Sequence, residues 1–386
     1  METMDRTSGW YGGISTYLSN VFDEGLHAKR IESLANATLG VMSSGSLAVS
    51  IIGQALSESR GLNSKHAIKQ VDRLLSNDGI DVWRLFEYWV PEQIGEQESI
   101  SVIIDWTDFN DDDQATIAIN MVTTNKYATP LLWLTVWKWE LKDTRNEFEY
   151  VCIKRLSEVV PKGKKVTILA DRGFGDRKLF KFIKELGFDY NIRIRGNINV
   201  TAPGGETRLA ADWVGKGGRA RRISGACVTT EQYEVGAVIC VHDKGMKEPW
   251  CLVISDRDIS KKDAIKGYAV RWKIEPSFRD TKDIRFGMGL SKTHVSEPQR
   301  RDRILLLNAF AITLLTMLGA AGESLGMDRL LKVNTVKRRT HSLFRQGLML
   351  YGLIPRMHEI KLKALIERFD ELLRQSRVFM IILQSK

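Results

Sequence analysis

The hydrophobic period of the sequence changes near residue 100, and this change constrains the fold more than any other feature. Before it, apolar residues recur at helical spacing, as in the run that ends near Arg60 and the next run, which ends near Leu75. After it, short apolar runs rich in β-branched and aromatic residues follow one another, which is typical of strands. The chain is therefore expected to begin with helices and to continue as a mixed α/β structure.

The elements after this change follow a definite order. The runs SISVIID, QATIAINMVT and YATPLLWLTVWKWE predict three strands, and a helix is expected over residues 146–159. KVTILAD then predicts a strand that ends at Asp171, followed by a glycine turn, a helix and a further strand in YNIRIRG. Three strands, a helix and then alternating strand and helix is the order expected of a ribonuclease H-like α/β domain.

Four regions are expected along the chain. Residues 1–95 form a helical N-terminal region, and residues 96–196 and 256–322 form the α/β core. Residues 197–255 contain short strands between glycine-rich turns and predict a β-rich insertion into that core. Residues 323–386 are expected to be helical to the end of the chain.

The charge balance favours a polyanionic partner. The 386 residues carry a formal net charge of +10, and lysine and arginine recur in clusters such as KGKK, KGGRARR and VKRR. A basic surface most simply serves nucleic acid, although many basic proteins bind none. The four cysteines show no C-x-x-C spacing and the histidines are scattered, so neither a disulfide framework nor a zinc site is expected. With no signal peptide expected at the N-terminus, the cytoplasm is the predicted compartment.

One segment is nearly long enough to cross a membrane. It runs from Ile304 to Gly322, follows three arginines and is interrupted by Asn308, Thr313 and Thr316. A buried core helix is the favoured interpretation, and a membrane span is the alternative.

The N-terminal region contains the outline of a helix-turn-helix. A break at Gly61 and a cap at Asn63 or Ser64 separate two apolar-periodic runs. The second run carries cations that could contact a DNA groove: Lys65, His66, Lys69 and Arg73. An ordinary helical hairpin is the alternative.

Three carboxylates on separate elements suggest metal-dependent phosphoryl chemistry. Asp105 and Asp171 each close an apolar strand, and Glu275 lies in a helix that begins after the S-x-x-D capping signal of Ser260. Three such groups can hold two hard divalent cations. Each could instead be a cap or turn residue, and Asp108 and Asp111–Asp113 compete with Asp105 for the first position. The acidic turn itself lacks the glycine of a calcium loop, so no calcium site is expected there.

The stretch YAVRWKIEPSFRDTK places Tyr268, Arg271, Glu275 and Lys282 at offsets 0, 3, 7 and 14, within an arc of about 60° on a helix. This spacing resembles the Tyr-Arg-Glu-Lys signature of bacterial cut-and-paste DDE transposases of the insertion-sequence-four family. IIDWTD around Asp105 and LADRGF around Asp171 resemble that family's two aspartate motifs. The resemblance covers about residues 100–320.

The resemblance implies a set of roles. Asp105, Asp171 and Glu275 would hold two Mg²⁺ or Mn²⁺ ions, and Tyr268, Arg271 and Lys282 would contact phosphates of the transposon end. Trp250 would stack on a flipped base during hairpin formation, with a core position in the insertion as its alternative. Pro276 departs from a regular helix directly after Glu275, which makes the position of Lys282 the least secure.

The implied function is DNA transposition. Two subunits would bridge two ends of double-stranded DNA, read by the N-terminal helices, and would join the free 3′-hydroxyls to target DNA near the nucleoid, away from membranes. The C-terminal helices would provide the contact between the two subunits. A ribonuclease H-like nuclease that cuts without joining, and a basic DNA-binding protein without catalysis, are the alternatives.

Overall fold

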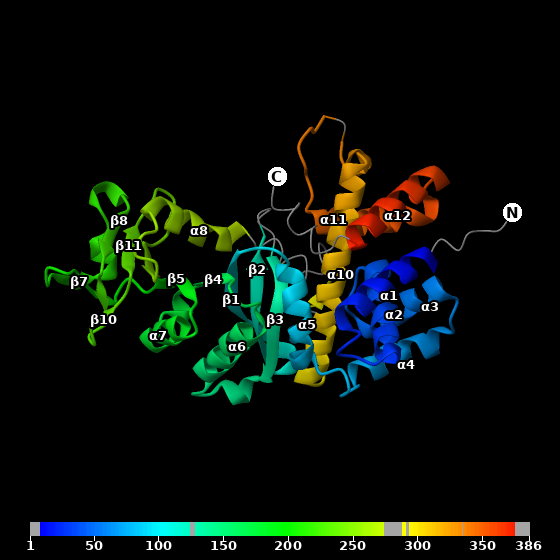
Figure 1. The fold of residues 1–386 in the computed structure, drawn as a ribbon, viewed down its shortest axis with the longest axis horizontal. Helices are drawn as coiled ribbons and strands as arrows, with labels where there is room; N and C mark the ends of the chain where they lie inside the picture. Colours follow the sequence, from blue (N-terminus) through cyan, green and yellow to red (C-terminus); the bar gives the residue numbers. More distant parts are fainter. Residues whose placement is uncertain (1–7, 124–127, 274–287, 291–292, 334, 375–386) are drawn as a thin grey trace.

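The computed structural model describes residues 8–123, 128–273, 288–290, 293–333 and 335–374. The described chain begins with a group of helices at one end of the molecule (Figure 1). These helices are α1 (Ser8–Phe22), α2 (Ala28–Ser44), α3 (Val49–Arg60) and α4 (Ser64–Leu75), and α5 (Val82–Ile94) follows them nearer the centre. The predicted helical N-terminal region is therefore present.

Helices α3 and α4 have the predicted helix-turn-helix outline. Gly61 ends α3 with a φ of 62°, a left-handed conformation that glycine adopts without steric cost. Asn63 caps α4, because its side-chain oxygen accepts a hydrogen bond from the backbone N–H of His66. The four side chains predicted to reach a DNA groove, Lys65, His66, Lys69 and Arg73, are exposed on α4. Their role in DNA binding stays a prediction.

The centre of the molecule is a mixed sheet. Its first five strands are β1 (Ser99–Phe109), β2 (Gln114–Val122), β3 (Ala128–Trp137), β4 (Lys165–Ala170) and β5 (Asp189–Ile194), in the spatial order β3-β2-β1-β4-β5. β1, β4 and β5 are parallel, whereas β2 runs antiparallel to both β1 and β3. Helix α6 (Arg145–Val159) precedes β4, and α7 (Arg177–Glu185) precedes β5. The predicted α/β class and the predicted order of elements are confirmed.

One strand boundary was predicted wrongly. Asp105 does not end β1, which continues for four more residues to Phe109 and pairs with β2 over its whole second half. Trp106, Thr107 and Phe109 favour extended structure, and backbone pairing with β2 outweighs the polarity of Asp105 and Asp108. The pairing of β1 with β4 does stop at Ile103 and Leu169, so Asp105 lies beyond the end of the parallel ladder.

Helices cover the free edge of β3. The indole N–H of Trp89 on α5 donates to the carbonyl of Pro130, and Pro130 itself has no N–H to satisfy. On the same strand, the backbone N–H of Thr135 donates to the carboxylate of Asp302. These contacts cap backbone groups that would otherwise lie open to another chain.

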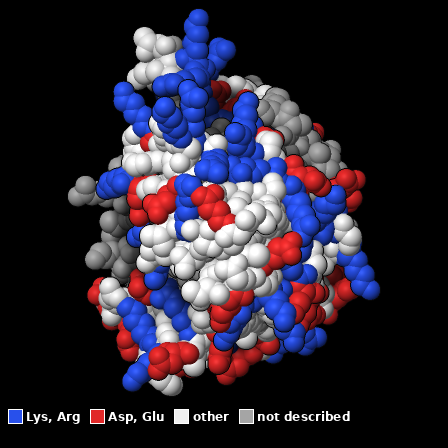
Figure 2. Space-filling view, turned by 90° about the vertical axis from the view of Figure 1, so that its left-hand side faces the viewer, with Lys and Arg blue, Asp and Glu red and all other residues white. Residues whose placement is uncertain are grey.

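The β-rich region after residue 197 shares the central sheet. Its strands are β6 (Asn199–Thr201), β7 (Thr207–Leu209), β8 (Arg221–Ser224), β9 (Cys227–Val228), β10 (Tyr233–Glu234), β11 (Ala237–Val241) and β12 (Trp250–Ile254). β12 pairs with β5, so β12, β11 and β8 extend the sheet to eight strands, while β10-β9-β6-β7 form a small second sheet. This region makes the end of the molecule opposite the N-terminal helices (Figure 1). Seen from that end, lysine and arginine side chains gather over the upper part of the surface (Figure 2).

The long apolar segment forms helix α10 (Pro298–Ser324), which contacts β3 and α2. In the described part of the chain, α10 is long and apolar enough to cross a membrane by length and composition, as is the bent pair α2 and α3 if it is taken as one span. However, 83% of the apolar window of α10 is buried inside the protein. This burial favours the core-helix interpretation.

The C-terminal region is helical with one interruption. A 3-10 helix (Met327–Leu331), α11 (Leu343–Leu353), a 3-10 turn (Ile354–Arg356) and α12 (Glu359–Arg374) follow α10. The prediction of helix throughout was wrong for the described residues between 332 and 342, which have no helical assignment. This stretch combines β-branched residues with four cations and lacks an apolar face, so packing does not support a helix there.

The two terminal regions pack together. The Trp10 ring of α1 lies 5.0 Å from the Phe369 ring of α12 and 5.9 Å from the Tyr351 ring of α11. Helices α10 and α11 approach so closely that a Cβ atom on Gly347 would collide with the carbonyl oxygen of Leu315. The N- and C-terminal helices thus share one core.

Candidate active site

Asp105 and Asp171 occupy matching positions on neighbouring parallel strands. The β1–β4 register ends with the pair Ile103 and Leu169, and the aspartates follow two residues later, Asp105 still within β1 and Asp171 one residue beyond the end of β4. Because side chains alternate along a strand, both carboxylates project on the same side at the carboxyl edge of this strand pair. The sequence predicted this meeting from the two apolar runs, although the first run proved longer than expected.

A guanidinium nitrogen lies between these carboxylates. Arg271 Nη2 is 3.5 Å from Asp105 Oδ2 and 3.6 Å from Asp171 Oδ2. The aspartate side chains are 37% and 39% exposed, whereas that of Arg271 is 16% exposed. Two half-exposed carboxylates thus share one largely buried cation, at distances typical of weak ion pairs.

Helix α8 (Lys261–Lys273) delivers Arg271 to this position. Its start is fixed as predicted, because Ser260 Oγ accepts from the N–H of Asp263 and donates to the Asp263 carboxylate. One turn later, the buried amide of Asn191 on β5 donates to the Ala264 carbonyl at 2.8 Å. α8 is therefore fastened to the sheet seven residues before Arg271.

Tyr268 and Trp250 pack together beside Arg271. Tyr268 is fully buried against an apolar cluster from β11 and β12, and its ring lies 5.1 Å from that of Trp250 in an edge-to-face arrangement. Trp250 is only half-buried. The half-buried position is compatible both with a core role and with stacking on a base, so the alternatives for Trp250 stay open.

Polar atoms of α8 are buried near the carboxylates without partners. Neither the Tyr268 hydroxyl nor the N–H at Arg271 Nε has a hydrogen-bond partner among the described residues. Burial raises the pKa of the Tyr268 hydroxyl, with the positive charges of Arg271 and Arg193 opposing the effect. The phenol is therefore a neutral donor at physiological pH, placed beside the carboxylate pair.

Asp171 also shapes the turn that follows β4. Its Oδ1 accepts from the N–H of Gly173 at 2.8 Å, capping the 3-10 turn Arg172–Phe174. A Cβ atom at Gly173 would lie 3.0 Å from Asp171 Oδ1, closer than side chains normally pack. The capping interpretation of Asp171 is thus correct for one oxygen, while the other oxygen faces Arg271.

Glu149 is a buried carboxylate that the sequence analysis did not single out. On α6, Glu149 Oε1 accepts from the indole N–H of Trp106 at 3.0 Å, and the Arg145 guanidinium lies over the Trp106 ring at 4.9 Å. Burial raises the Glu149 pKa to about 7, with the Trp106 hydrogen bond and Arg145 opposing it and Asp176 and Asp171 adding to it. Trp106 directly follows Asp105, so this bond fixes the strand beside the carboxylate pair.

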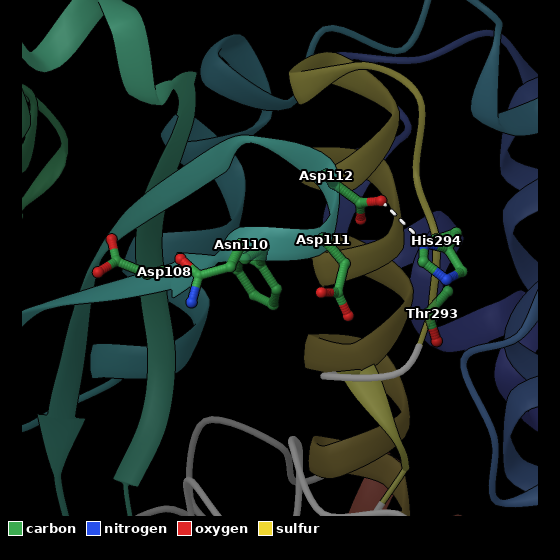
Figure 3. A pocket seen from close by; sticks show the side chains of 7 residues that line it. Asp108, Asn110, Asp111, Asp112, Thr293 and His294 are labelled. Atoms are coloured by element: carbon green, nitrogen blue, oxygen red, sulfur yellow. Dashed lines mark hydrogen bonds and ion pairs between the residues drawn. The ribbon is translucent and has the colours of Figure 1, made fainter.

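The acidic turn after β1 has a structural role at Asp112. Figure 3 shows Asp112 joined to His294, with Asp111 on the same turn and Asp108 apart on β1. The Asp112 carboxylate lies 3.1 Å from His294 Nδ1, accepts from the N–H of Val295 at 3.1 Å and pairs with the fully buried Arg301. Asp112 thus anchors the segment before α10 to the β1–β2 turn. These bonds weigh against Asp112 as the first metal ligand.

The remaining predicted residues, Glu275, Pro276 and Lys282, lie outside the described residues. Within the described residues, no group of three His, Cys, Asp or Glu side chains is placed to hold a metal ion. The pair Asp105 and Asp171 nevertheless offers two hard oxygen donors around a position of positive charge. This arrangement fits part of a magnesium or manganese site.

Residues 143–314 match the family model of the transposase DDE domain. The match supports a DDE transposase. It covers less than half of the chain and includes Asp171, Tyr268, Arg271 and Trp250, whereas Asp105 lies before it. None of the curated proteins matches the chain.

Proposed function

We propose that this chain is a DNA transposase that cuts transposon ends and joins their 3′-hydroxyls to target DNA. The single observation that carries the proposal is the meeting of Asp105 and Asp171, whose carboxylates lie 3.5 Å and 3.6 Å from the same atom, Arg271 Nη2. The family match to residues 143–314 supports the same reaction class. By resemblance, the finer assignment is to the insertion-sequence-four family.

A ribonuclease H-like core is part of the proposal. The spatial order β3-β2-β1-β4-β5, with β1, β4 and β5 parallel, supports this assignment. In such a core, Asp105 and Asp171 lie at the carboxyl edge of the central strands.

Asp105, Asp171 and Glu275 would hold two divalent metal ions. Bound there, Mg²⁺ or Mn²⁺ would polarise a phosphodiester and lower the pKa of an attacking water or hydroxyl. Arg271 offers a guanidinium that can leave the carboxylates and fork onto a DNA phosphate. The buried Tyr268 hydroxyl offers a neutral donor to the same backbone, and Trp250 an aromatic face for an unstacked base.

The remaining features of the proposal come from the family resemblance. Cleavage would proceed through hairpins, two subunits would bridge two DNA ends through their C-terminal helices, and α3 and α4 would read the terminal repeats. Lys282 would add a phosphate contact. The protein would act on cytoplasmic DNA.

The experiment is a strand-joining assay with short duplexes taken from the DNA on either side of the gene. We expect joined product with Mg²⁺, and loss of both cutting and joining in Asp105→Asn and Asp171→Asn, because neutral amides are poorer ligands for hard cations. Asp108→Asn makes the same change at the exposed competing position of the same strand, and retained activity in this variant would assign the first ligand to Asp105. Cutting without joining would favour the nuclease, and DNA binding unaffected by metal would favour a non-catalytic binding protein.

A further inference from the structure

A group of lysine and arginine side chains lies away from the carboxylate pair, where β8 meets the start of α8. Lys261 Nζ donates to the carbonyl of Ala220 at 3.3 Å, and the Arg222 guanidinium donates to the carbonyl of Arg257. These bonds hold β8 and the residue before it against the start of α8 and the segment that leads into it. The group, here called the basic strip, consists of Lys216, Arg219, Arg221, Arg222, Lys261, Lys262 and Lys266.

The charges of the basic strip are not neutralised by neighbouring carboxylates. None of its seven cations forms a salt bridge with a carboxylate in the described part of the chain, whereas Arg155, Arg172 and Arg303 elsewhere all do. The nearby Asp256 and Asp263 form no salt bridge with the strip and instead accept from neutral donors, Asp256 from the backbone N–H groups of Asp258 and Ile259, and Asp263 from the Ser260 hydroxyl. Unpaired, largely exposed cations in such a group attract a polyanion.

Protection of a sheet edge does not explain the strip. β8 is the edge strand of the eight-stranded sheet, and charged residues on an edge strand discourage pairing with other chains. Only Arg221 and Arg222 lie on β8, however: Lys216 comes from the preceding 3-10 turn, Arg219 from the residue after that turn, and the other three cations from α8. A role beyond edge protection is needed for these five.

Helix α8 relates the strip to the active site. Lys261 and Arg271 are ten residues apart on this helix, which is roughly 15 Å at the rise of an α-helix. B-DNA rises about 3.4 Å per base pair, so this length corresponds to about four or five base pairs. A duplex that runs along α8 with one phosphate at Asp105 and Asp171 would therefore reach the strip within half a helical turn.

We infer that the basic strip binds the phosphate backbone of double-stranded DNA next to the segment that is cut. This inference rests on the proposed function, because it takes DNA as the substrate of the carboxylate site. The contact is to phosphates and carries no base specificity. It would lengthen the DNA footprint along α8 and hold the duplex in line with the site.

The test measures how duplex binding depends on salt, with the full-length protein and a 30-bp duplex of arbitrary sequence. Each phosphate contact contributes about 0.9 to the slope of log K against log salt concentration. Lys216→Gln, Arg219→Gln and Lys262→Gln, combined in one protein, remove three exposed cations that make no ion pair with a described carboxylate. We expect the slope to fall by about 2.7.

The matched control is a triple glutamine variant at Lys162, Lys164 and Lys165. It changes the net charge equally, but these residues lie at the start of β4, at the end of the strand opposite to Asp171. We expect its slope to stay within about one contact of the wild type. As a second variant, Lys262→Gln with Lys266→Gln, both exposed on α8, should lower the slope by about 1.8. Thermal melts of all variants establish that each is folded.

Asp171→Asn separates the inference from the proposed function. This variant should bind the duplex with a slope within about one contact of the wild type, since Asp171 also pairs with Arg271, and should lose cleavage of the end duplexes. Wild-type slopes in both strip variants, or an equal fall in the control, would overturn the inference while leaving transposition intact. Salt-independent or absent binding by the wild type would overturn both.

Discussion

The carboxylates of Asp105 and Asp171 meet at a single nitrogen atom, Nη2 of Arg271. This guanidinium occupies the position beside both carboxylates that a metal ion would take in the proposed catalytic state. Under the proposed function, Arg271 would therefore have two competing sets of partners, the carboxylates and the DNA backbone.

The competition at Arg271 predicts that Arg271→Gln strengthens metal binding in the DNA-free protein. Removing this partly screened positive charge should make the binding free energy of Mn²⁺ more favourable by about 1 kcal/mol, which is roughly a fivefold gain in affinity. Titration calorimetry with Mn²⁺ measures the change. Arg172→Gln is the control, because Arg172 pairs with Glu248 instead of the aspartates. Unchanged or weaker Mn²⁺ binding in Arg271→Gln would contradict the competition.

Tyr268→Phe should separate stability from catalysis. The buried hydroxyl has no hydrogen-bond partner within the described residues, so its removal should leave the free energy of unfolding unchanged or raise it by up to about 1 kcal/mol. The rate of DNA cleavage should fall, because the hydroxyl proposed to donate a hydrogen bond to the DNA backbone is lost. Urea denaturation and the cleavage assay measure the two effects. Tyr351→Phe, a buried change in the helical core, should leave cleavage intact, and a normal rate in Tyr268→Phe would remove the hydroxyl from the site.

The stability of the protein should carry a pH dependence from Glu149. Its pKa is about 7 in the folded protein against 4.5 in the unfolded chain, so between these values the unfolded state releases its proton first. The contribution of Glu149 is thus complete below pH 4.5 and declines as pH rises to about 7, by about 1.4 kcal/mol per pH unit at most.

Glu149→Gln isolates this contribution, because glutamine still accepts from Trp106 but does not titrate. Urea midpoints at several pH values should show a flatter profile for Glu149→Gln than for the wild type. Glu147→Gln, an exposed change on the same helix, should follow the wild type. Parallel profiles for all three proteins would mean that Glu149 is ionised in the folded state.

The close approach of α10 and α11 predicts a large effect of one methyl group. Gly347→Ala places a Cβ atom against the Leu315 carbonyl, so the helices must separate, at a cost of about 1–3 kcal/mol. Gly352→Ala, on the same helix but with nothing within 4 Å of the new atom, should be neutral or stabilising by up to about 1 kcal/mol. Thermal denaturation compares the two, and equal melting temperatures would show that the contact is not tight.

Local signals in the sequence predicted much of this fold. The Gly61 break, the Asn63 cap and the Ser260 capping box each depend on neighbouring residues, and each is present. The strand that ends before Asp171 was predicted for the same reason, since its apolar run is bounded by a turn.

The features that the sequence did not predict depend on distant partners. β1 continues past Asp105 because β2 pairs with it, and β12 joins the central sheet because β5 offers an open edge. Glu149 shares a helical face with Cys152, Ile153 and Leu156, and this spacing was the available signal for its burial. Its bond to Trp106, however, requires knowledge of how α6 lies on the sheet.

The contact of Trp10 with Phe369 and Tyr351 bears on how the polypeptide matures during synthesis. Helix α1 leaves the ribosome hundreds of residues before α12 is translated. The indole of Trp10 therefore cannot be buried against Phe369 and Tyr351 until synthesis is almost complete. A nascent chain that stalls before α12 would keep the Trp10 side chain exposed to solvent, and such exposed hydrophobic surface is what chaperones bind.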